Sequence, residues 1–274
     1  MRLNRSGYEN FADYLLQTGI GLPVSDDCCV NIPTYIAMYS NLNQLFEYVY
    51  GKDINGLTAA QLSECAILAP LNASVRNLNT TALHQLRGQS KLYLSSDEEL
   101  DGEGNVITDL PPEVLNNMQR PGLPVHELKL KVKALVMCMR NLSRDVCNGT
   151  KLQVQNLHHN LIDCVILTGP ARGNTISLPR ITLTDSRSPD TVILRRKQFP
   201  VSLAYAMTID KSQGQSLQRV GIALDTPCFA HGQLYTALSR CRDPSSLAVY
   251  VPEGHSWSRR VKNVVWKEVF PQSL

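Results

Sequence analysis

The sequence of 274 residues is long enough for one large domain or two small ones, and 43% hydrophobic and 19% charged residues are ordinary for a globular protein. A formal net charge of +3 permits a nucleic-acid partner without indicating one. The amino-terminal residues lack the apolar core of a secretory signal, and no apolar run approaches a membrane span. We therefore expect an intracellular protein with no membrane partner.

The eight cysteines show no CxxC spacing and mostly lie in apolar runs. This pattern predicts reduced, buried thiols and excludes the usual zinc and disulfide arrangements. Asp26-Asp27 and His158-His159 have no further ligand at a useful spacing, so we expect a loop and a turn there.

The first 124 residues combine helical periodicity with one buried strand, over residues 65–70, which ends at Pro70. Thr58 is a candidate N-cap for the third helix. Residues 91–99 form an apolar strand that ends in acidic residues, like a Walker B element. No phosphate-binding loop precedes it, so we reject that role. The expected helices cover residues 8–17, 42–50, 58–63, 72–86 and 111–118.

Apolar residues alternate with polar ones from Val125, which predicts a small all-β module over residues 125–198. Arg195, Arg196 and Lys197 follow its last strand. A solvated strand end and a phosphate contact explain this basic run equally well. The expected strands cover residues 126–132, 135–139, 151–155, 161–167, 175–178 and 192–194.

After Phe199 the chain returns to an α/β alternation, with a polar turn over Thr208–Gly214. The turn offers hydroxyl, ammonium and amide donors, and a glycine that lets the backbone approach a ligand closely, so it suits an anion. A solvated turn between two strands is the alternative. The expected elements are strands over 201–207, 219–224 and 247–251 and a helix over 230–240.

The basic tail after Val251 predicts either a last helix packed through Val264, Val265 and Trp266 or a DNA-facing arm, and the sequence does not decide between them.

Several segments resemble one family. LAYAMTIDKSQGQSL and HGQLYTALSRCRD resemble motifs V and VI of superfamily-1B DNA helicases, specifically the Pif (petite integration frequency) family and its Helitron-transposon branch. ILAPLNASVRNLN resembles motif IV, although Leu71 stands where the family usually has Lys. LKLKVKALVMCMRNLSRDVCNGTKLQV and ILTGPARGNTISLPRITL resemble the SH3-like insertion of these helicases, with Lys133 in place of an expected Gly and Leu135 in place of Pro.

The resemblance implies an α/β fold, namely a RecA-like second motor domain of the P-loop NTPase type with a small all-β SH3-like insertion. Residues 1–124 and 199–252 would form the RecA-like domain, 125–198 the insertion and 253–274 a basic tail.

The resemblance also assigns roles to single residues. Arg240 would be the arginine finger, and the alternative for it is a cation at a helix C-terminus. Asn72 would contact DNA, and the alternative is a helix N-cap, which is compatible with that contact. Gln213, Gly214 and Gln215 would bind nucleotide. The remaining DNA contacts would be Thr208, Lys211 and Ser212.

No GxxxxGK[ST] segment occurs in these residues, and the only Gly-Lys pair, Gly51-Lys52, lacks the upstream glycine. The resemblance thus covers the C-terminal half of an ATP-dependent 5′-to-3′ DNA helicase of repair, recombination or Helitron transposition, located in the nucleus. ATP and Mg²⁺ would serve the complete helicase, and we expect this chain alone to bind neither and to be inactive. Its partners would be single-stranded DNA and an N-terminal RecA-like half, in cis or in trans. The alternative is a non-catalytic single-stranded-DNA-binding fragment or a remnant of a decayed transposon helicase.

Overall fold

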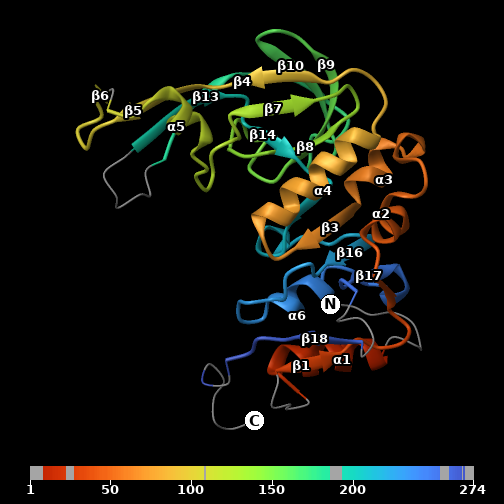
Figure 1. Cartoon of the computed structure of the whole chain (residues 1–274). Helices are drawn as coiled ribbons and strands as arrows, with labels where there is room; N and C mark the ends of the chain where they lie inside the picture. The colour runs from red at the N-terminus through yellow and green to blue at the C-terminus, as the bar shows by residue number, and fades with distance from the viewer. Residues whose placement is uncertain are drawn as a thin grey trace. The chain divides into compact units, whose positions relative to one another are not determined.

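The computed structural model describes residues 9–22, 28–107, 109–185, 193–253, 259–266 and 268. Contacts divide the chain into two compact units (Figure 1). Unit 1 contains residues 1–82 and 205–274, and unit 2 contains residues 83–204. Residues 83–124, which the sequence placed with the first α/β segment, thus cluster with the β-rich residues in unit 2. The predicted metal-free loop at Asp26-Asp27 lies outside the described residues.

Unit 1 is built on a parallel five-stranded sheet in the order β15-β3-β16-β17-β2. All five residues of β3 are buried, as expected for a strand covered on both faces. Its strands are β2 (Ala37–Tyr39), β3 (Cys65–Ala69), β15 (Ala206–Thr208), β16 (Arg219–Ala223) and β17 (Leu247–Tyr250).

Helices cover both faces of this sheet. On one face α2 (Leu42–Tyr50) packs so closely that a Cβ at Gly221 would lie 2.7 Å from Val49 Cγ2. On the other face α1 (Glu9–Ile20) and α6 (Gln233–Leu238) share a core with Val220, Ile222 and the rest of that face. The result is an α/β/α layering, in which α6 lies against the sheet.

The helices confirm most of the predicted helical segments. α3 (Ala59–Ser63) begins with the predicted cap, since Thr58 accepts a hydrogen bond from the Gln61 backbone and the Gln61 side chain accepts one in return. α4 (Asn72–Gln85) and α5 (Pro112–Asn117) also lie where they were expected. α6 is shorter than the predicted helix over 230–240 because Gly232, with φ of 67°, precedes it. The described residues also form short 3₁₀ helices, among them η1 (Ile54–Gly56), η2 (Asp210–Ser212) and η3 (Pro244–Ser246).

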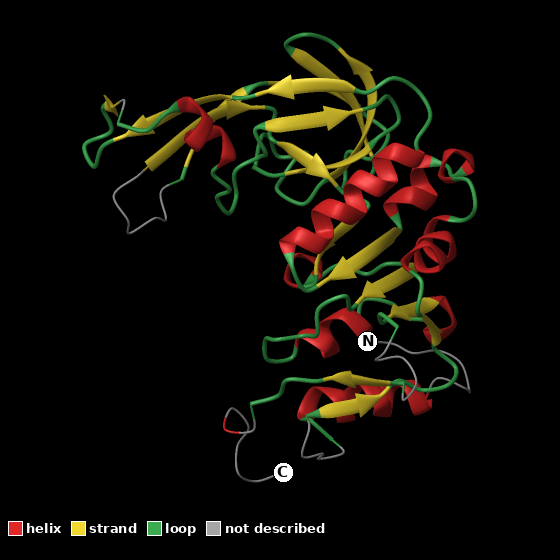
Figure 2. Cartoon of the chain, viewed as in Figure 1, coloured by secondary structure: helices red, strands yellow, loops and turns green. Residues whose placement is uncertain are grey.

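Unit 2 is mainly β-structure, as Figure 2 shows, and its strands confirm the predicted alternation. One antiparallel sheet has the order β11-β10-β9-β8-β14, a second has the order β12-β13-β5-β6, and β4 pairs with β7. The strands are β4 (Lys91–Leu94), β5 (Ser96–Leu100), β6 (Val106–Ile107), β7 (Glu127–Leu130), β8 (Leu135–Cys138), β9 (Lys151–Leu157), β10 (Leu161–Ile166), β11 (Thr175–Pro179), β12 (Ile181–Thr184), β13 (Ile193–Gln198) and β14 (Val201–Leu203).

The prediction of one strand over residues 201–207 is wrong. β14 pairs antiparallel with β8 in unit 2, whereas β15 pairs parallel with β3 in unit 1. The change occurs between Ala204, which donates to Leu135 O, and Tyr205, whose carbonyl accepts from Ile67 N. Both halves of the segment are apolar, so periodicity did not reveal that they belong to different sheets. Residues 91–99 divide in the same way, into β4 and β5.

Lys133 has a φ of 68°, in the left-handed region that glycine favours. In the turn before β8, Lys133 N donates to Val154 O at 2.8 Å. A lysine therefore stands at a position whose backbone suits the glycine of the resembling family, at a strain cost of about 1–2 kcal/mol.

Of the two alternatives for the tail, the structure contradicts the helix, and the DNA-facing arm stays a prediction. Residues 260–262 are not helical. They form β18 (Arg260–Lys262), which pairs antiparallel with β1 (Cys29–Asn31). Residues 263–266 are not helical, so Val264, Val265 and Trp266 do not form the packed helix that was one alternative.

All eight cysteines have free thiols, and five of them are buried. Cys28 and Cys147 are exposed, which corrects the expectation for these two. Burial raises the pKa of Cys164 and of Cys228 to about 12. In the described residues no three His, Cys, Asp or Glu side chains gather as a metal site would require, and none of the helices found there is long and apolar enough to cross a membrane.

Candidate functional site

The carboxyl end of the unit 1 sheet brings two predicted segments together. β15 and β3 are parallel neighbours, with Thr208 opposite Ala69, and Ile209 N donates to Ala69 O at 3.1 Å. α4 begins at Asn72, three residues after β3 ends. Thr208 and Asn72 thus follow adjacent strands at the edge where parallel sheets bind ligands. Asn72 is exposed and is the first residue of α4, so it does not precede the helix as an N-cap would.

The turn after β15 exposes some of its polar groups and buries others. Ser212 is fully buried, and its hydroxyl donates to Ile209 O at 2.6 Å. Thr208 is only 7% exposed. Lys211 and Gln213 are exposed, and Gly214 has a φ of 80° with open space where a side chain would be. The buried hydroxyl of Ser212 therefore holds the turn, while Lys211 and Gln213 can reach a ligand.

Arg240 ties this turn to the end of α6. Its Nη1 donates to Gln215 O at 3.0 Å and to Ser212 O at 3.4 Å, and its Nε donates to Thr236 O at 2.9 Å. Its Nη2 donates to Ser239 Oγ at 2.9 Å. The backbone is fixed as well, because Leu217 N donates to Arg240 O at 2.9 Å. The guanidinium is thus oriented by both segments that the sequence assigned to the site.

All four of these acceptors are neutral oxygens, so they orient the guanidinium without cancelling its charge. In the part of the chain that the structure describes, no carboxylate pairs with Arg240, which is half-buried. A guanidinium stays protonated and can grip two oxygens of one phosphate at once. The site therefore presents a fixed positive charge beside the backbone of Gln213 to Gln215, which suits an anionic ligand.

The structure joins Arg240 directly with Ser212 and Gln215, and Gln215 Nε2 donates to Lys211 O at 3.2 Å. Gln213 and Gly214 lie in the same turn. Thr208 and Asn72 share the sheet edge from which the turn starts.

Two further side chains of α4 support the site, and the sequence reasoning missed both. Asn79 Nδ2 donates to Ala206 O and Asn79 Oδ1 accepts from Ala206 N, each at 2.9 Å, so a buried side chain continues the backbone pairing of β15. Ser74 Oγ donates to Asp225 Oδ2 at 2.6 Å, which ties α4 to the loop after β16. For Asn79 the only local signal was an asparagine at a position of the predicted helix that faces the core, because a buried amide needs hydrogen-bond partners. No local pattern indicates the role of Ser74, whose partner is 151 residues away.

The basic run lies within β13 rather than after the strand, and its two arginines have another role than either alternative expected for the run. Arg196 is 2% exposed at its side chain and forms a two-point pair with Asp97, Nε to Oδ1 at 2.8 Å and Nη2 to Oδ2 at 2.6 Å. Its remaining donors bind Pro124 O and Leu115 O, both at 3.0 Å. Arg195 pairs with Glu98 at 2.6 Å near the surface. The two arginines therefore pair with carboxylates of the adjacent strand β5.

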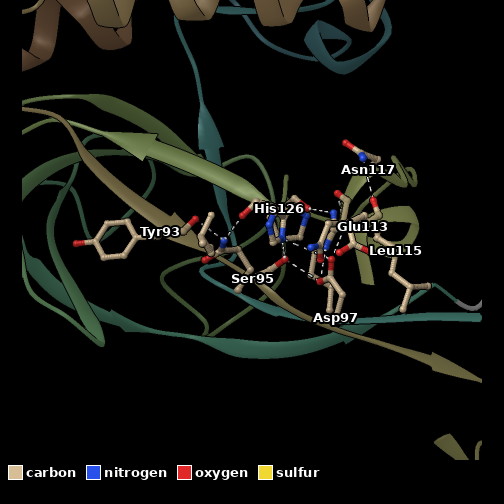
Figure 3. A network of polar contacts seen from close by, with 12 residues as sticks. Tyr93, Ser95, Asp97, Glu113, Leu115, Asn117 and His126 are labelled. Carbon is tan, nitrogen blue, oxygen red and sulfur yellow. Dashed lines mark hydrogen bonds and ion pairs between the residues drawn. The ribbon is translucent and has the colours of Figure 1, made fainter. Parts of the chain in front are cut away.

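Asp97 also belongs to a polar network with Ser95 and His126, whose side chains point toward one another in Figure 3. Ser95 Oγ donates to Asp97 Oδ1 at 2.7 Å and lies 2.8 Å from His126 Nδ1. Because the serine hydroxyl has one proton, His126 donates to it. The acidic residues after β4 thus satisfy buried donors of unit 2.

Comparison with known proteins gives one consistent family. The family model described as "DNA helicase Pif1, 2B domain" matches residues 113–157. The ATP-dependent DNA helicase Pif1 of Campylobacter jejuni is 29% identical over 192 residues, which cover 67% of this chain and 41% of that protein. The human ATP-dependent DNA helicase PIF1 is 31% identical over 218 residues, covering 72% of this chain and 32% of that protein.

Solved structures share the fold. The Pif1 helicase from Candida albicans superimposes with a TM-score of 0.60 at 23% identity, covering 95% of this chain and 56% of that one. A Bacteroides Pif1 helicase in complex with ADP-AlF3 and single-stranded DNA gives a TM-score of 0.55 at 21% identity, covering 96% and 58%.

The chain spans only a part of the relatives that it matches, between 25% and 41% of the length of three of them. The family model falls in unit 2, and the fold likeness extends over nearly the whole chain. Sequence and fold together relate this chain to the Pif1-type helicase family, over a part of the length of its members.

Proposed function

We propose that this chain is the C-terminal motor domain of an ATP-dependent 5′-to-3′ DNA helicase of the Helitron branch, which works with an N-terminal RecA-like half in cis or in trans. It would act in the nucleus in DNA repair, recombination or transposition. The observation that carries the proposal is the guanidinium of Arg240, which four neutral oxygens orient and no described carboxylate neutralises.

Arg240 is proposed as the arginine finger. In phosphoryl transfer negative charge spreads over the oxygens of the transferred group, and a fixed guanidinium stabilises that charge. Gln213, Gly214 and Gln215 are proposed to line the same nucleotide edge, because Arg240 binds their turn through Gln215 O. Mg²⁺ and the remaining phosphates are proposed to be held by the other half, because a P-loop supplies the Lys and the Ser or Thr for them and no GxxxxGK[ST] segment occurs in these residues.

DNA is proposed to cross the carboxyl edge of the unit 1 sheet. Lys211 is the exposed cation of the turn, and Asn72 is an exposed amide at the start of α4. Thr208 and Ser212 are buried and would act by fixing the turn from which Lys211 projects. Contacts of this kind position a phosphate backbone without reading its sequence.

Unit 1 is proposed as the second RecA-like domain and the sheet β11-β10-β9-β8-β14 as the SH3-like insertion. The parallel sheet between helix layers supports the first assignment. The match of the Pif1 2B family model to residues 113–157, which include β8 and β9, supports the second.

A non-catalytic protein that binds single-stranded DNA is the second candidate. The lack of a GxxxxGK[ST] segment in these residues favours it for the chain acting alone. The two candidates share the DNA site and differ in their need for ATP.

ATP hydrolysis distinguishes the helicase motor domain from the non-catalytic DNA-binding protein. We expect the purified chain to show no DNA-stimulated hydrolysis by itself, and to support hydrolysis when it is joined to an N-terminal half of a Pif1-type helicase that carries a P-loop. Hydrolysis by the chain alone would contradict the assignment of phosphate binding to the other half. A joined protein that folds and binds ATP but does not turn it over would leave the non-catalytic candidate.

A further inference from the structure

An aromatic pair joins the tail to the residues just before α6 in unit 1. The rings of Trp266 and His231 stack, with centroids 5.6 Å apart and planes inclined by 24°. Trp266 N donates to His231 Nδ1 at 2.9 Å, which places the imidazole proton on Nε2 and fixes the ring. Trp266 nevertheless remains 58% exposed. The imidazole thus supports the indole while much of its surface is open to solvent.

The path of the tail explains why the indole points outward. From β18 onward, alternate residues point into unit 1: Val261 and Asn263 are buried, and Val265 packs against Gly21. Asn263 Nδ2 donates to Thr18 O at 2.8 Å. Gly232 N donates to Val264 O at 3.0 Å, which joins the tail to the start of α6.

The same alternation places two cations on the outward side of the tail. Arg260 and Lys262 are exposed and share the outward side of the tail with Trp266. Phe229, two residues before His231, is 55% exposed. Glu268 is also exposed, so the segment is not uniformly positive. Ring stacking, rather than net charge alone, would therefore have to supply much of the binding.

We propose that Trp266, supported by His231, stacks on a base of single-stranded DNA whose phosphates contact Lys262, a contact separate from the turn at Lys211. The inference rests on the proposed function, because it takes DNA as the ligand. Aromatic faces with nearby cations are the features by which proteins bind single strands without sequence preference. A purely protein partner would gain less from an exposed cation on the same side of the tail as the ring, since charged residues are depleted at the centres of such interfaces.

Fluorescence of Trp266 tests the stack directly. The chain has two tryptophans, so Trp257→Phe leaves Trp266 as the only indole. We expect oligothymidylate to quench this fluorescence on binding, because stacking on a base couples the two ring systems. An oligonucleotide of the same length with abasic sites keeps the phosphates, and we expect it to bind more weakly and quench little.

Variants extend the test to affinity. Trp266→Ala should weaken binding of labelled oligothymidylate by roughly 5- to 150-fold, the range for loss of one stacked base, and Trp266→Phe should lose less. Lys262→Ala should lower the slope of log K against log salt by about 0.7, the value for one single-strand phosphate. Tyr35→Ala, at an aromatic residue of unit 1 that is 45% exposed, is the matched control and should not change binding.

Three results would overturn the inference: bound DNA that leaves the Trp266 fluorescence unchanged, a folded Trp266→Ala chain with unchanged affinity, or no DNA binding at all. A Trp266→Ala chain that loses association with the N-terminal half in the absence of DNA would also overturn it, in favour of a protein contact. Absence of DNA binding would also count against the proposed function. The other results leave it open, because it depends on ATP hydrolysis by the joined protein and on the separate DNA contact at Lys211.

Discussion

Arg196 in unit 2 and Arg240 in unit 1 are both held by several hydrogen bonds, but to different kinds of acceptor. Arg196 has a two-point pair with the carboxylate of Asp97 and is almost fully buried. Arg240 binds three backbone carbonyls and one hydroxyl and stays half-buried. The carboxylate neutralises the first charge, whereas neutral oxygens only orient the second.

The difference separates a structural arginine from one that is ready to bind an anion. A buried charge is tolerated when it is paired and its other donors are satisfied. Such a charge contributes nothing to the binding of an anionic ligand. A guanidinium fixed by carbonyls keeps its attraction for a phosphate and loses little entropy on binding. The kind of acceptor that a guanidinium binds therefore indicates whether an arginine is structural or ready to bind an anion.

Arg196→Ala should have the largest effect on stability. It leaves Asp97 buried without its partner, and breaking such a pair costs about 3–5 kcal/mol in the free energy of unfolding. Urea unfolding of the purified chain measures this. Arg195→Ala, at the partly exposed pair with Glu98, is the matched control and should cost no more than about 1 kcal/mol. Equal costs for the two variants would remove the distinction between the buried and the surface pair.

Arg240→Ala should lower the free energy of unfolding much less than Arg196→Ala, by about 1 kcal/mol. No buried carboxylate is left behind, and Gln215 N still donates to Ser212 O when the guanidinium is gone. The same urea experiment applies. A loss as large as that of Arg196→Ala would make Arg240 a structural residue.

The two regions also differ in how far the sequence revealed them. The turn, α6 and Arg240 lie within a stretch of about 30 residues, so the family resemblance could assign them all to one site, although it did not predict the hydrogen bonds of Arg240 to Ser212 and Gln215. Arg196 and Asp97 are 99 residues apart, and only the register of β13 on β5 makes them neighbours. Nothing in the spacing of either segment indicates that register.

Long-range pairing explains the other misses in the fold. The change of sheet at Ala204 and Tyr205 and the pairing of β18 with β1 both depend on distant strands. By contrast, α2, α3 with its Thr58 cap, and the buried strand β3 were predictable, because periodicity, capping and continuous apolar runs act locally.

Lys211→Ala tests whether the exposed cation of the turn contacts a DNA phosphate. If Lys211 contacts a phosphate, its loss should weaken single-stranded DNA binding about equally for all sequences and reduce the salt slope by about 0.7. Titrations at several salt concentrations measure the slope. Lys52→Ala removes an exposed lysine that lies near Glu47 on α2 and serves as the control. An unchanged slope would mean that the turn does not hold DNA.

Ser239→Ala should have the smallest effect. It removes one of the four acceptors that orient Arg240, worth about 0.5–1 kcal/mol, so the rate of ATP hydrolysis by the joined protein should fall about two- to fivefold. Ser239→Thr keeps the hydroxyl and should retain most of the rate. A rate unaffected by Ser239→Ala would show that the remaining three hydrogen bonds are sufficient to position the guanidinium.

The most direct test of the central claim is the turnover of ATP by the joined protein with Arg240→Ala. The account predicts that the variant folds and binds ATP, while hydrolysis falls by about 10³-fold or more, as loss of an arginine finger does. Arg240→Lys keeps the charge without the planar fork and should recover only part of the rate. Turnover that is unchanged in the folded Arg240→Ala protein would contradict the account.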